Sequence, residues 1–215
     1  MKAAQRGFSL IELLIALAIL GALLALGAST YRNWLSNVRI RTTAEAIENG
    51  LQLARGEAVR RNTRISFQLM SSVDDACIVS APNTPIGSDW VVSFDPPASA
   101  CAAAPLNEAF RVTDAANNPP PRIIQVRSAA EGSRNVVVSA AQTLFIFNGL
   151  GRLVANPGGS PVPIDLSYPT AGTCAAAAGQ LRCLRVTVTL GGQVRLCDPA
   201  YPTTGALATD AQRCF

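Results

Sequence analysis

The stretch Arg6-Gly7-Phe8-Ser9-Leu10-Ile11-Glu12-Leu13-Leu14 opens an apolar run that continues to Ala28. The sixteen residues from Leu13 to Ala28 carry no charge, and Lys2 and Arg6 precede the run. As a helix, the twenty-one residues 8–28 would be about 32 Å long, enough to cross a bilayer core of about 30 Å. A basic leader before an apolar segment agrees with export of the remaining chain.

Glu12 distinguishes this run from an ordinary apolar segment. A carboxylate costs roughly 2.5–3.5 kcal/mol at the middle of a bilayer, less near the interface, and residues of this kind are usually functional. A secretory signal peptide cleaved near Gly27 or Ala28 would also have the basic start and the apolar run, as would a plain signal anchor. Neither alternative explains Glu12.

The leader, Gly7, Phe8, Glu12 and the apolar helix occur in a register that resembles the processing motif of type IV prepilins and type II secretion pseudopilins. The resemblance implies that a prepilin peptidase cuts after Gly7 and that the new amino group of Phe8 is methylated. It also implies that Glu12 pairs with the charged N-terminus of a neighbouring subunit in a filament. Inside an apolar helical bundle an unpaired carboxylate and an unpaired ammonium are each costly, so docking them together offsets both penalties.

A second helical segment follows the apolar run, without a proline from Arg32 to Arg61. Its apolar residues recur in steps of 4, 3, 4, 3 and 4, at Ile40, Ala44, Ile47, Leu51, Ala54 and Ala58. This spacing marks one face of a helix. We therefore predict one long helix, apolar all round to about residue 28 and amphipathic to about residue 61.

The basic cluster 60–64 is expected to end this helix, because positive charge at a helix C-terminus complements the helix dipole. We prefer this interpretation to a binding patch. Candidate soft points are the glycines, because each costs on the order of 1 kcal/mol relative to alanine: Gly21, Gly27, Gly50 and Gly56.

Beyond Asn62 the apolar period becomes two, as in half-buried strands. The candidate strands are Ile65–Leu69, Trp90–Phe94, Ile123–Val126, Val136–Ser139, Thr143–Phe147, Leu184–Leu190 and Gln193–Cys197. Turn-rich stretches separate them at 81–89, 95–105, 117–121 and 157–163. Gly191-Gly192 predicts a tight hairpin between the last two strands. A helix followed by strands, without alternation of the two, predicts an α+β fold with antiparallel sheet.

Composition excludes several classes of function. The 215 residues are 49% hydrophobic and 15% charged, which suits one compact domain. The net charge of +4, from seventeen scattered arginines and one lysine, is too small to imply a nucleic-acid partner. The absence of histidine removes the commonest general base and metal ligand. The pair Asp74-Asp75 and the glycine-rich stretches 149–152 and 158–160 lack a catalytic or phosphate-binding pattern. We predict no enzyme activity, no cofactor, no metal and no small-molecule substrate.

All six cysteines lie beyond residue 76, and none forms a Cys-x-x-Cys pair. This favours disulfides in an oxidising compartment over a zinc ribbon. Proximity favours the pairs Cys77–Cys101, Cys174–Cys183 and Cys197–Cys214, with buried free thiols as the alternative. The last pair would close a loop of about fifteen residues, worth about 3 kcal/mol in the chain-entropy estimate.

The stretch Leu144–Arg152, together with the closing hairpin Leu184–Cys197, resembles the GspH/FimT family of minor pseudopilins and minor pilins. The resemblance implies a long helix packed against two β-sheets, in a low-abundance subunit near a filament tip. Residues 71–135 have no pattern that we can place. The chain would then divide into a leader (1–7), a transmembrane and filament-core helix (8–30), an amphipathic helix (31–62) and a periplasmic β-rich domain (63–215).

The function implied by the resemblance is that of a minor pilin or pseudopilin. It would take part in assembly, or in the tip or priming complex, of a type II secretion pseudopilus or type IV pilus. The subunit would move from the inner membrane into the filament, and its partners would be the prepilin peptidase, other pilins or pseudopilins and the inner membrane.

The alternative function is DNA binding, because some FimT-type pilins serve in DNA uptake. Their Gly-Arg-x-Arg motif falls here on Gly192-Gln193-Val194-Arg195, so only Arg195 carries over. Arg182, Arg185 and Arg213 are candidates for further phosphate contacts, but no aromatic stacking platform lies nearby in the sequence.

Processing gives the first testable prediction. The mature protein should lack residues 1–7 and carry one methyl group on Phe8, because the motif places both reactions there. The intact mass of the mature chain measures this. A chain that begins at Ser29, or one that retains Met1, would contradict the prepilin assignment.

Overall fold

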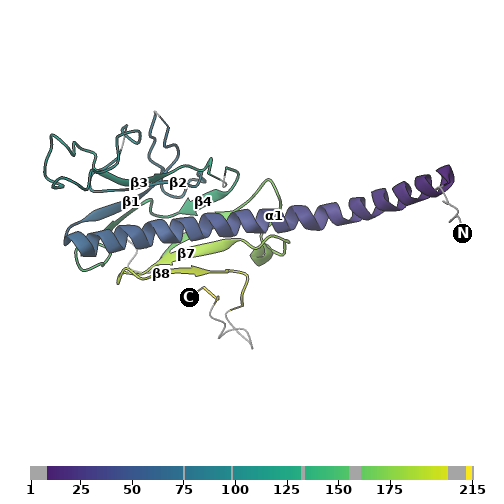
Figure 1. The fold of residues 1–215 in the computed structure, drawn as a ribbon. Coiled ribbons are helices and arrows are strands. Elements are labelled where there is room, and N and C mark those ends of the chain that lie inside the picture. The colour runs from purple at the N-terminus through teal and green to yellow at the C-terminus, as the bar shows by residue number, and fades with distance from the viewer. Residues whose placement is uncertain are drawn as a thin grey trace, which may run out of the picture.

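One uninterrupted helix dominates the fold (Figure 1). The computed structural model describes residues 9–74, 76–97, 99–131, 134–154, 161–202 and 212–214, with the backbone alone at 25–29. Helix α1 runs from Leu10 to Arg61, 52 residues. It ends at Asn62, whose φ of 47° is left-handed and whose N–H donates to the last carbonyl groups of the helix, as expected at a helix C-terminus. The predicted single long helix is confirmed.

In the part of the chain that the structure describes, eight strands form two four-stranded sheets. The bounds are β1 Ile65–Met70, β2 Asp89–Ser93, β3 Ile123–Arg127, β4 Val137–Ala140, β5 Leu144–Phe147, β6 Val162–Ser167, β7 Leu184–Val188 and β8 Val194–Cys197. The first sheet has the order β3-β2-β1-β5 and the second the order β4-β6-β7-β8. Each pairing is antiparallel, so the predicted α+β class is confirmed. A short 3₁₀ helix, Ala175–Ala177, precedes β7.

Strand β6 corrects the sequence interpretation, which placed residues 157–163 in a loop. Val162 and Pro163 instead pair with β7, and β6 is an inner strand of the second sheet. Proline lacks a backbone donor and is normally excluded from inner strands. It is tolerated here because the pairing with β4 ends at Ile164, so Pro163 lies beyond the stretch that β4 covers.

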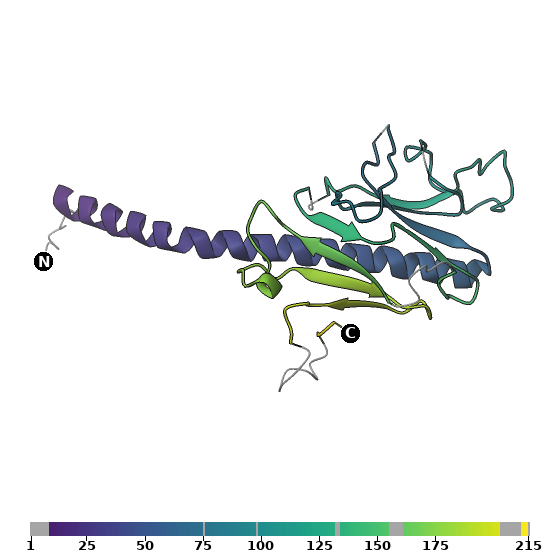
Figure 2. The ribbon, with the colours of Figure 1, turned by 180° about the vertical axis from the view of Figure 1, so that it is seen from behind.

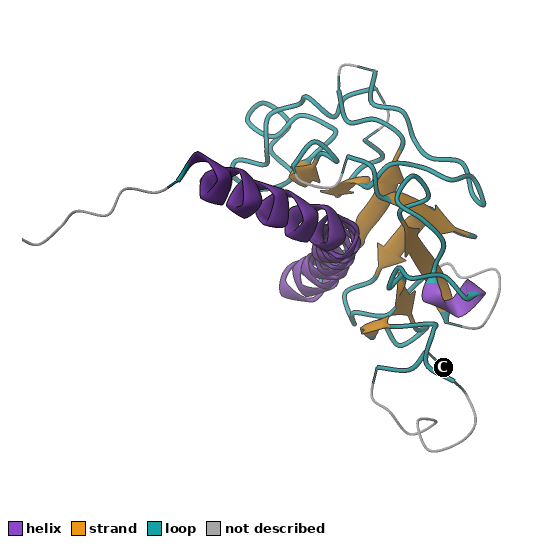
Figure 3. Ribbon diagram, turned by 90° about the vertical axis from the view of Figure 1, so that its right-hand side faces the viewer, coloured by secondary structure: helices purple, strands orange, loops and turns teal. Residues whose placement is uncertain are grey.

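The C-terminal half of α1 packs against both sheets. It contacts β1, β2 and β5 of the first sheet and β6, β7 and β8 of the second, and Figures 1 and 3 show the helix lying along them. The side chains predicted to share a face are fully buried: Ile40, Ala44, Ile47, Leu51, Ala54 and Ala58. Full burial stabilises a side chain the size of leucine by about 1.5–3 kcal/mol. This face of the helix is therefore a principal part of the core.

Gly50 is a packing residue and not the soft point expected from its low helix propensity. A Cβ atom at this position would lie 2.8 Å from Cε2 of Phe67 and 3.0 Å from the ring of Trp90. The helix backbone therefore approaches the first sheet more closely than any larger residue would allow. Gly56 differs, because a Cβ there would meet nothing within 4 Å.

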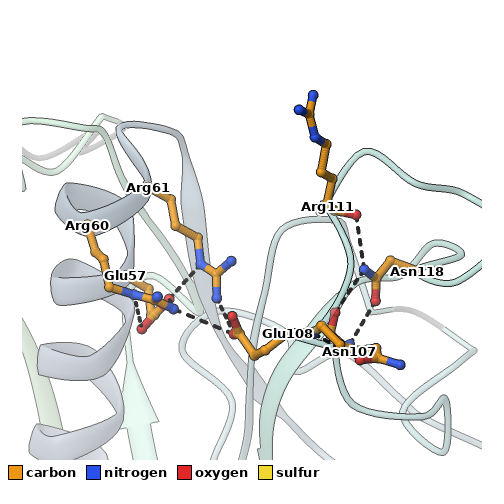
Figure 4. A network of polar contacts seen from close by, with 8 residues as sticks. Glu57, Arg60, Arg61, Asn107, Glu108, Arg111 and Asn118 are labelled. Carbon is orange, nitrogen blue, oxygen red and sulfur yellow. Dashed lines mark hydrogen bonds and ion pairs between the residues drawn. The ribbon is translucent and has the colours of Figure 1, made fainter.

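The long connection between β2 and β3 is tied to the last turn of α1 (Figure 4). Arg61 pairs with Glu57 at 2.7 Å and also with Glu108 of that connection. Burial opposes ionisation of Glu57, but hydrogen bonds from Arg60 and Arg61 outweigh it and lower the pKa. Because the pKa is lowered in the folded state, this contribution to stability is lost as the pH falls through the folded pKa.

Buried Asn118 organises the same connection. Its Oδ1 accepts from the N–H of Asn107 at 2.7 Å, and its Nδ2 donates to the carbonyl groups of Asn107 and Arg111. These bonds satisfy the amide in a segment that has little secondary structure. This part of residues 71–135, which had no recognisable pattern, is held by side-chain hydrogen bonds to backbone groups 7 and 11 residues away.

Three disulfides join Cys77 to Cys101, Cys174 to Cys183 and Cys197 to Cys214. These are the pairs that proximity favours. The first lies in a separate small core with Met70, Val91 and Ile123. The other two lie at the ends of β7 and β8, in the second sheet.

The two helix glycines yield a matched prediction. Gly50→Ala should destabilise the full chain by about 1–3 kcal/mol, because overpacking against Phe67 and Trp90 outweighs the better helix propensity of alanine. Gly56→Ala should stabilise it by up to about 1 kcal/mol, since the new methyl group enters open space. Urea unfolding in detergent measures both. Equal effects of the two substitutions would contradict the close approach at Gly50.

Candidate assembly helix

The N-terminal half of α1 projects beyond the two sheets, as Figures 1 and 2 show from opposite sides. Its large apolar side chains are exposed along the whole stretch. The first of them, Leu10, is 77% exposed, and the last described one, Leu24, is 66% exposed. Soluble proteins rarely expose so continuous an apolar surface unless it meets a partner or a membrane. In the part of the chain that the structure describes, no helical segment is both long and apolar enough to span a membrane.

Glu12 is the single charged residue of the sequence between Phe8 and Ala28, and it is exposed in the first turn of α1. Its backbone N–H donates to the carbonyl of Ser9 at 3.1 Å. The carboxylate is therefore held at the tip of the projecting helix, far along α1 from the core face that begins at Ile40. Gly7 and Phe8, the predicted processing residues, lie outside the described residues.

Polar contacts fix α1 where it leaves the sheets. Nδ2 of Asn33 donates to Oε1 of Gln180 at 2.7 Å, and Oδ1 of Asn37 accepts from the N–H of Arg182 at 2.8 Å. Gln180 and Arg182 belong to the loop closed by the disulfide Cys174–Cys183. The loop therefore holds the helix where it leaves the sheets, and we call these contacts of Asn33 and Asn37 the clamp.

Two residues after Asn37, Arg39 strengthens this clamp by donating to the hydroxyl of Tyr168 at 2.9 Å. Tyr168 also accepts from Asn135, and these hydrogen bonds, that from Asn135 foremost, lower the pKa of its phenol. Sequence reasoning missed this clamp. Its one signal was the polar spacing of Asn33 and Asn37, four residues apart on one helix face.

The arginines proposed for DNA contact are engaged within the chain. Arg185 makes two bonds to the carboxylate of Asp165, at 2.6 and 3.0 Å, and Nη1 of Arg182 lies 2.8 Å from Asp198. A cation already paired with a carboxylate attracts phosphate less strongly. Arg195, on β8, and Arg213 also interact within the chain. The four residues are not gathered into an unpaired basic cluster, and the DNA-binding alternative is not supported.

Asp74, of the acidic pair noted in the sequence, lies in a local turn. Asp74 accepts from the backbone N–H of Ala76 and from the hydroxyl of Ser72, whereas Asp75 lies outside the described residues. Among the residues that the structure describes, no group of three or more His, Cys, Asp or Glu side chains could hold a metal ion.

Two sequence profiles match the chain. One, described as type II transport protein GspH, covers residues 43–192, which is more than half of the chain. This chain belongs to the GspH family. The other, the prokaryotic N-terminal methylation motif, covers residues 2–28 and therefore includes Gly7, Phe8 and Glu12. This protein is a minor pilin or pseudopilin, a class of structural filament subunits. The family resemblance seen in its sequence is therefore confirmed.

Solved structures of the type IV minor pilin FimU from Pseudomonas aeruginosa PAO1 are also similar. In two crystal forms the identity is 15% and 16%, with TM-scores of 0.45 and 0.46. The alignments cover 81% and 82% of this chain and 99% and 95% of FimU. No curated protein matches this sequence significantly.

Proposed function

We propose that residues 8–30 hold this GspH-family protein in the inner membrane until it enters a filament as a low-abundance subunit. The observation that carries the proposal is the exposed apolar N-terminal half of α1, with Glu12 near its tip. The apolar run of the sequence extends through residues 25–29, whose side chains lie outside the described ones. The same surface would contact lipid in the membrane and other helices in the filament.

Processing prepares the helix for this transfer. Cleavage after Gly7 by a prepilin peptidase creates an amino group on Phe8, four residues from Glu12. Methylation leaves that amino group positively charged. Once the helix leaves the lipid headgroups for an apolar bundle, the amino group of one subunit and Glu12 of the next neutralise each other. The carboxylate therefore selects the register in which neighbouring helices pack.

The periplasmic domain, residues 63–215 with the amphipathic half of α1, supplies the surfaces that meet other pilins or pseudopilins. Its disulfides suit an oxidising compartment. The role is structural and needs no catalysis, cofactor or small-molecule substrate. We place the subunit in assembly, or in the tip or priming complex, of a type II secretion pseudopilus or a type IV pilus.

Glu12→Ala tests this function. The variant should fold normally, because residue 12 is far along the helix from the core, but its incorporation into filaments should fall by about tenfold or more, the effect of losing a charge-assisted contact of about 1.4 kcal/mol or more. Glu45→Ala is the matched control, because Glu45 is on the same helix and its partner Arg41 is largely exposed. Filament fractionation measures both variants. Equal incorporation of Glu12→Ala and wild type would remove the proposed role of the carboxylate.

A further inference from the structure

Two aromatic residues stand exposed on α1 directly after the apolar run. The side chain of Tyr31 is 62% exposed and that of Trp34 is 58% exposed. Their ring centroids are 5.9 Å apart, with the rings tilted by 31°. By contrast, Phe67 and Trp90, which pack in the core beside α1, are buried. Exposure of two adjacent amphipathic rings therefore calls for an external partner.

The position of this pair along the helix indicates the partner. From Leu10 to Tyr31 the chain advances twenty-one residues, or about 32 Å of helix, which matches a hydrocarbon core of about 30 Å. When the preceding residues span the membrane, Tyr31 and Trp34 lie at its outer boundary. Tyrosine and tryptophan concentrate at this depth, because their rings favour the acyl region while the hydroxyl and the indole N–H remain hydrated.

The residues near Tyr31 and Trp34 are also consistent with a position of the two rings at the membrane boundary. Leu20 and Leu24 precede Tyr31 at helical spacing, so the rings extend the exposed apolar surface. Arg32, which stands between Tyr31 and Trp34 in the sequence, is also exposed. Its guanidinium can therefore reach lipid phosphate groups. The clamp formed by Asn33 and Asn37 begins within the same turns, so the folded domain would sit directly above the headgroups.

We propose that Tyr31 and Trp34 form an interfacial anchor that binds the phospholipid headgroup layer on the periplasmic side of the membrane. The proposal rests on the membrane insertion in the proposed function. The anchor sets the depth of α1, and with it the height of Glu12 within the bilayer, before the subunit is transferred. Arg32 adds a charge contact to lipid phosphate at the same level.

A second subunit is the competing partner. Trp34 and Val38 also line a groove of about 450 Å³, beside Leu196, Asp198 and Tyr201. A groove of this kind could receive part of a neighbouring protein. The match between helix length and bilayer thickness favours lipid, and the experiment separates the two partners.

The chain has two tryptophans, which permits a direct test because Trp90 is buried at 2% exposure. The full mature chain is reconstituted into vesicles of phosphatidylethanolamine and phosphatidylglycerol. The acyl chains are brominated either close to the headgroup or close to the terminal methyl group. We expect quenching of Trp34 to be about two-fold or more stronger with the shallow bromines, as for an interfacial ring. Trp34→Phe should abolish bromine-dependent quenching and leave the emission of Trp90.

Tyr31→Ala tests the partnership of the two rings. This variant should lower the ratio of shallow to deep quenching of Trp34, because one of the two interfacial rings is lost. Phe110→Ala is the matched control, since Phe110 is 45% exposed but lies in the connection tied to the opposite end of α1. The control should leave the ratio unchanged, and an equal change in both variants would overturn the anchor.

Flotation of the vesicles measures membrane insertion independently. A wild-type chain that does not float overturns both the membrane insertion and the anchor. A chain that floats while Trp34 is unquenched, or is quenched mainly by the deep bromines, overturns the anchor alone. Blue-shifted Trp34 emission that grows with the protein-to-lipid ratio, without quenching by lipid, assigns the ring to a neighbouring subunit and also overturns the anchor.

Discussion

Burial of one face of α1 between two sheets is the interaction on which the rest of the structure depends. Ile47 and Leu51 lie at the centre of that face and belong to the same core as Phe67 of the first sheet and Val186 of the second. Each sheet has an apolar face to cover, and the helix serves both. Because the helix is fixed along this face, its N-terminal half projects away from the two sheets (Figure 1), and the described side chains from Leu10 to Leu24 are exposed.

The fold was largely predictable where periodicity is strong. The core face from Ile40 to Ala58 follows from helical spacing alone, and the hairpin between β7 and β8 follows from Gly191-Gly192. Strand β6 was not predictable, because Pro163 is a strand breaker in any local interpretation. Its presence depends on where β4 ends, which is a property of the sheet and not of the neighbouring residues.

The candidate site was predictable for a different reason. Glu12 lies outside the folded core, so the role that we propose for it rests on an anomaly in an apolar run and needs no tertiary information. The opposite holds for the clamp at Asn33 and Asn37, whose partners lie well over one hundred residues away. The carboxylates that pair with Arg182 and Arg185 were likewise invisible to local patterns, which is why a basic DNA-binding surface remained an open alternative from sequence. Gly50 was misjudged because helix propensity describes an isolated helix and not one pressed against a sheet.

We propose that helix α1 divides its length between two tasks: one half stabilises the domain and the other contacts partners outside the chain. The most direct test compares the free energy of unfolding of the mature chain with that of a chain beginning at Thr30, both with intact disulfides. We expect the two free energies of unfolding to agree within about 0.5 kcal/mol, as for changes away from the core. A loss of several kcal/mol on removal of the apolar half would show that it helps to fold its own domain, and would contradict this division.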